Sequence, residues 1–90
     1  METLTAQQAA IKLVKAYAIR GDDMNHFRGG GLGTYCDEYQ ASVGGYVSGK
    51  KIPNTKIIVM KVNGEECNEL FDLEQIWELA INGIEQPTLL

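Results

Sequence analysis

The chain has 90 residues, of which 44% are hydrophobic and 22% are charged, and its formal net charge at pH 7 is −4. This composition predicts a single domain over residues 1–90, too short to hold separate cofactor and substrate domains. No apolar run reaches the roughly 18 residues of a membrane helix, and no signal-peptide pattern opens the chain, so we expect a cytoplasmic protein. The two cysteines, Cys36 and Cys67, are too few for a disulfide framework and are expected to be reduced.

Charge is divided unevenly along the chain. Residues 1–61 contain all eight basic residues and five acidic ones, a net charge of +3. Residues 62–90 contain seven acidic residues and no basic residue, a net charge of −7. Such asymmetry concerns partners and association rates rather than fold.

The first helix is predicted over residues 6–20. Residues 5–8 have the form of a capping box, and Gly21 is a natural stop. The apolar residues recur at helical spacing and form a broad face, so this helix is expected to be covered on most sides.

A flexible glycine-rich loop is predicted over about 21–34. Asp22 and Asp23 can cap a short turn through His26, but the four glycines between 29 and 33 lose much backbone entropy on ordering. Because glycines provide few buried contacts, fast amide exchange is expected over residues 28–33.

Residues 35–49 fit either a strand or a helix. Apolar and polar residues alternate from 39 to 48, which is the period of a half-buried strand. A helix capped by Thr34 and ended by Gly49 is the alternative. Gly44 and Gly45 favour the strand, because two interior glycines cost a helix about 2 kcal/mol relative to alanine.

A hairpin followed by a helix, in residues 56–84, is the clearest pattern in the chain. An apolar run at 56–62 meets Asn63 and Gly64, the pair that a type I′ turn favours because both of its central residues need positive φ. The acidic segment after the turn is typical of an edge strand. The run at 56–62 is therefore predicted to be the middle strand of a sheet.

This middle strand is expected to follow a connection over residues 50–55. Regular alternation places its apolar side chains on both faces of the sheet. The expected division is Ile58, Met60 and Val62 on one side, with Ile57 and Val59 on the other.

The last helix begins after Asp72, whose carboxylate can accept a hydrogen bond from the backbone of Gln75. Gly83 stands where a helix C-cap belongs, and Trp77 is expected at the centre of the core. The whole pattern predicts an α+β fold of order α-β-β-β-α, a three-stranded antiparallel sheet with two helices packed on it.

No motif specifies catalysis. Residues 44–50 match the first seven positions of the phosphate-loop pattern, but Lys51 stands where Ser or Thr is required, and Pro53 prevents the following helix. His26, Cys36 and Cys67 lack the spacing of a nucleophile pair or a zinc site. We therefore expect no enzymatic activity, no cofactor and no metal.

Two functions remain as predictions. The first is a non-catalytic protein-binding domain, for example an inhibitor of nucleic-acid-handling machinery, whose acidic face contacts a basic surface of a protein partner through Glu65, Glu66, Glu69, Glu74 and Glu78. The competing interpretation of these residues is a charged coat that keeps the protein soluble. Direct nucleic-acid binding is not expected, because basic residues are few.

The alternative function is binding of a small phosphate or nucleotide ligand. Consecutive backbone amides in a glycine-rich loop can form an anion-binding nest, and nearby cations can add charge. The residues of this alternative site, at the interface of a homo-oligomer, are Arg28, Gly29, Gly30, Gly31, Lys50 and Lys51.

Overall fold

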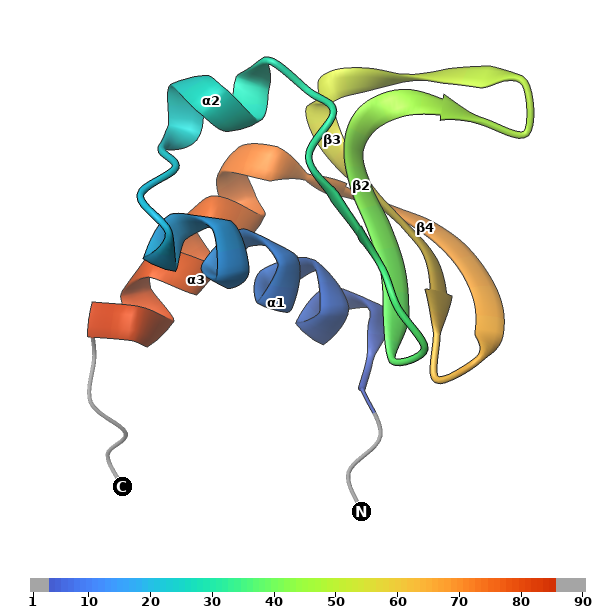
Figure 1. The fold of residues 1–90 in the computed structure, drawn as a ribbon, viewed down its shortest axis with the longest axis horizontal. Helices are drawn as coiled ribbons and strands as arrows, with labels where there is room; N and C mark the ends of the chain where they lie inside the picture. Colours follow the sequence, from blue (N-terminus) through green and yellow to red (C-terminus); the bar gives the residue numbers. More distant parts are fainter. Residues whose placement is uncertain (1–3, 86–90) are drawn as a thin grey trace.

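A computed structural model describes residues 4–85 as three helices and four strands. The elements are α1 (Ala6–Ile19), α2 (Met24–Arg28), β1 (Gly33–Tyr35), β2 (Tyr39–Val47), β3 (Lys50–Val62), β4 (Glu65–Asp72) and α3 (Leu73–Glu85). The strands form one antiparallel sheet in the order β1-β2-β3-β4. α1 and α3 lie together on one face of this sheet (Figure 1). The predicted α+β fold is confirmed.

The sheet has four strands instead of three. Residues 35–49 contribute a strand, β2, and the helical alternative for this segment is wrong. The additional strand is β1, whose three residues pair with the first part of β2. A three-residue strand is too short to produce a recognisable period, which is why the pattern of the sequence did not indicate it.

The segment predicted as a glycine-rich loop contains α2 and the start of β1. Asp23 caps α2, its carboxylate accepting a hydrogen bond from the backbone N–H of His26 at 3.0 Å. The backbone of Gly31 donates to Val43 O at 3.0 Å. The expectation of fast exchange is therefore withdrawn for Gly31, because its amide is hydrogen-bonded to the sheet.

The largest of the fully buried side chains belongs to Phe27 on α2. Its side chain is fully buried, and its ring makes edge contacts with Tyr17 at 6.0 Å and Trp77 at 5.4 Å between centroids. Trp77 itself is only half-buried and packs against the core from outside, so its expected place at the centre is wrong. The other large, fully buried side chains come from α1, β3 and α3: Leu13, Ile57, Leu73 and Ile76.

A bulge at Met60 changes which side chains of β3 face the helices. Val59 and Lys61 both pair with neighbours on β2 and β4, whereas Met60 has no register partner on either strand. One unpaired residue shifts, by one position, the alternation of side chains between the two faces of the sheet. Val62 consequently joins Ile57 and Val59 in the core beneath the helices, and its expected place on the opposite face is wrong.

The β2–β3 hairpin bends at Gly44 and continues as an arm (residues 45–52) that projects from the sheet (Figure 1). Its turn is formed by Ser48 and Gly49, both with positive φ, so β3 begins at Lys50, within the expected connection over 50–55. Between Ile52 and Ile57, no residue of β3 is paired with β2. Pro53, which has no N–H to donate, lies in this unpaired stretch.

The predicted N-caps of α1 and α3 are confirmed, but the expected C-cap at Gly83 is wrong, because α3 continues through this residue to Glu85. The hydroxyl of Thr5 accepts from the backbone of Gln8 at 3.1 Å, and the Gln8 side chain accepts in return at 3.0 Å. The Asp72 carboxylate accepts from the backbone N–H of Gln75 at 3.2 Å. Lys12 ties α1 to the β1–β2 turn through Glu38, and this hydrogen bond raises the pKa of Lys12.

Candidate functional site

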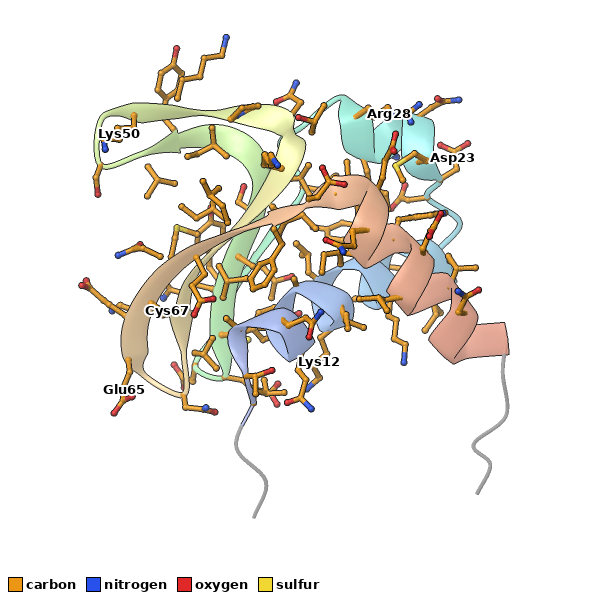
Figure 2. The ribbon with its side chains drawn as sticks, turned by 180° about the vertical axis from the view of Figure 1, so that it is seen from behind. Lys12, Asp23, Arg28, Lys50, Glu65 and Cys67 are labelled. Atoms are coloured by element: carbon orange, nitrogen blue, oxygen red, sulfur yellow. The ribbon has the colours of Figure 1, made fainter. Side chains whose placement is uncertain are left out.

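The five acidic residues predicted to bind a partner fall into two groups. Glu65, Glu66 and Glu69 lie on β4, and Glu74 and Glu78 lie on α3, all with exposed side chains. Glu65 is at the end of β4 that adjoins the β3–β4 turn, and α3 starts at the other end (Figure 2). An eight-residue strand is about 25 Å long. The fold therefore spreads the acidic residues along β4 and onto α3 without forming one compact cluster.

Basic residues of the chain neutralise part of this acidic surface. Arg28 on α2 pairs with Glu74 at 2.7 Å, and Lys56 pairs with Asp72 at 3.7 Å. Lys61 lies directly opposite Glu66 in the β3–β4 register. Among the side chains that the structure describes, four of the five glutamates make no ion pair: Glu65, Glu66, Glu69 and Glu78. Three of these four belong to β4.

The side chains of β4 point to both faces of the sheet. Glu69 lies opposite Val59, which belongs to the core beneath the helices, so Glu69 is on the helix side. Leu70 lies opposite Ile58 and is on the open side, away from the helices. β4 is also the last strand of the sheet. Its free edge is therefore flanked by an unpaired carboxylate on one face and a leucine on the other.

A hollow of about 310 Å³ lies on the open side, between the arm and β4. Its apolar lining comes from Val47, Ile52, Ile58 and Leu70, with Lys50 and Asn68 among its polar residues. Ile52 and Ile58 are buried although they do not belong to the core beneath the helices, so the arm covers a second, smaller apolar cluster. Leu70 remains 53% exposed. The sequence did not predict this hollow, because its lining residues come together through the bend of the β2–β3 hairpin.

The residues of the alternative ligand site are not brought together. The backbone amides of Gly29, Gly30 and Gly31 donate to protein carbonyls at 3.0–3.1 Å and are not directed at a common point. Lys50 lies near the tip of the arm, and Arg28 lies on α2 at the opposite side of the molecule (Figure 2). Lys51 lines a separate hollow of about 390 Å³ with Pro53 and Asn54.

The residues considered for catalysis lie on different elements. His26 on α2 hydrogen-bonds through Nδ1 to the Asp22 carboxylate. The exposed Cys36 lies between β1 and β2, with its thiol 3.5 Å from Tyr39 O. The Cys67 thiol on β4 donates to Val59 O at 3.1 Å, where the β3–β4 register shifts. Each group thus has a local partner of its own.

Within residues 4–85, no group of three or more His, Cys, Asp or Glu side chains is placed to hold a metal ion. No helix in the same range is long and apolar enough to cross a membrane. Comparisons with protein-family models, with curated protein sequences and with solved structures found no match.

Proposed function

We propose that the protein is a non-catalytic protein-binding domain and that β4 with the start of α3 is its acidic binding surface. The observation that carries this proposal is the pair Glu65 and Glu69, two exposed carboxylates on an edge strand that no basic side chain of the described chain neutralises. A basic surface on a partner would supply the missing charge. Complementary charges of this kind accelerate association and select the partner.

A protein that handles nucleic acid is a suitable partner, because its phosphate-binding groove presents the required lysines and arginines. An acidic domain seated in that groove would compete with nucleic acid, so inhibition is the role we propose. The alternative, binding of a phosphate or nucleotide by the glycine-rich segment, has less support. Its amides already have acceptors, and Arg28 is paired with Glu74.

Reversal of charge at Glu65 and Glu69 tests the proposal. The double variant E65K/E69K is expected to melt within a few degrees of the wild type, because exposed charges contribute little to stability. Association with the partner captured from the native host is expected to slow by about tenfold or more at low salt. The wild-type on-rate should fall steeply with added salt, since steering acts over a screening length of about 8–10 Å. Surface plasmon resonance across a salt series measures both effects.

A control variant matched in net charge separates the local effect from the global one. A16K/N25K/D37K raises the net charge by the same amount at three exposed positions outside β4 and α3. It is expected to associate at close to the wild-type rate. If both variants slow equally, only net charge matters, and if neither slows, the acidic residues are a solubilising coat. A rise in melting temperature on addition of nucleotide would instead favour the ligand alternative.

A further inference from the structure

The outer edge of β4 is open to another strand. β4 pairs with β3 on one side only, and within residues 4–85 the backbone of residues 65–72 makes no further backbone hydrogen bonds. Such an edge presents a row of free N–H and C=O groups that can accept a strand from another chain. The strand has eight residues, with an irregularity at Cys67 and Asn68, which have no register partner on β3. Glu69 and Leu70 belong to the regular part that follows, residues 69–72.

Protection against aggregation does not account for all the features of this edge. Charged side chains are a common device that keeps edge strands apart, and Glu65, Glu66 and Glu69 can serve that purpose. Protection by charge does not explain an exposed leucine on the same strand. Leu70 is 53% exposed and lies at the hollow formed with Ile58 and the arm. The free edge of β4, the hollow beside Leu70 and the acidic side chains together form a surface that suits an incoming strand.

We infer that β4 binds an extended segment of the partner as a fifth strand of the sheet. The inference rests on the proposed function and specifies the element that the partner contributes. The residue placed opposite Leu70 faces the open side, where its side chain extends toward the hollow. The next residue lies opposite Glu69 on the helix side and meets an unpaired carboxylate. The segment therefore carries a large apolar residue adjacent to a lysine or arginine, whichever way the strand runs.

A second copy of the same chain fits this edge poorly. β4 contains four acidic residues and no basic one: Glu65, Glu66, Glu69 and Asp72. Two β4 strands side by side would bring eight carboxylates together, and like charges on neighbouring strands are destabilising. The charge of the edge thus selects a basic strand from another protein.

A blocked eight-residue peptide in which lysine alternates with valine or leucine is the probe. Its control has the same side chains and N-methyl groups on every backbone nitrogen, which removes the donors needed for strand pairing. The unmodified peptide is expected to bind the full chain at least tenfold more tightly than the control. It should also shift the backbone NMR signals of residues 65–72. Equal affinity of the two peptides, or no binding of the unmodified peptide at millimolar concentration, would overturn the inference.

Two leucine variants test the hollow. L70S is expected to weaken binding of the unmodified peptide by about tenfold, whereas L79S, at an exposed leucine of α3, should leave it unchanged. Both variants should retain the wild-type melting curve, since neither side chain belongs to the core. The proposed function has a separate test. It is contradicted if E65K/E69K associates with the native partner as fast as the wild type does. If E65K/E69K slows the partner but L70S and N-methylation have no effect, the acidic surface binds without strand addition.

Discussion

Replacement of Phe27 by alanine is expected to reduce the free energy of unfolding by about 3–5 kcal/mol. The ring is fully buried and contacts both Tyr17 on α1 and Trp77 on α3, so its loss leaves a cavity at the place where α2 meets the other helices. The total free energy of unfolding of a small domain is only about 5–15 kcal/mol. The variant should therefore be close to its unfolding midpoint without denaturant, or should reach it at a low denaturant concentration.

Urea titration followed by Trp77 fluorescence measures this loss. Tyr46, on the arm, is 74% exposed, and Y46A is the matched control for removal of an aromatic ring. It is expected to change the unfolding free energy by less than about 0.5 kcal/mol. If F27A is as stable as Y46A, α2 does not pack as the structure describes, and residues 21–34 are the mobile loop that the glycines indicated.

Placement of aspartate at Val62 is expected to cost about 3–5 kcal/mol, whereas aspartate at Met60 should cost about 1 kcal/mol. Val62 is 7% exposed and belongs to the core beneath the helices. A carboxylate there loses its hydration without gaining a cation. Met60 is half-buried and stands in the bulge, where a charged group can reach solvent.

The same urea titration compares V62D with M60D. The two residues are two positions apart, so an uninterrupted strand would place them on the same face and the two variants would lose similar amounts of stability. A large difference supports the bulge. Equal losses would mean that β3 keeps its regular alternation.

Local signals in the sequence predicted the parts of the fold that depend on neighbouring residues. Asn63 and Gly64 form the expected turn with φ of 57° and 83°, and Thr5 and Asp72 cap the helices as expected. These predictions succeed because the interacting groups lie within four positions of each other.

The missed features depend on contacts between distant residues. Nothing near Phe27 distinguishes it from an exposed loop residue, because Trp77, one of its aromatic contacts, is fifty positions away. The bulge at Met60 arises from pairing with two other strands. The positions of the acidic residues on β4 and α3 followed from the sequence, but the ion pair between Arg28 and Glu74 did not, since it joins residues 46 positions apart.

The packing of α1 against α3 has a consequence for synthesis of the protein. The core combines Ala9 and Leu13 from the first helix with Leu73 and Ile76 from the last. On the ribosome, α1 and the strands emerge before α3, and their apolar faces lack the helix that covers them. Until α3 emerges, these apolar surfaces stay uncovered, and the contact between Phe27 and Trp77 cannot form.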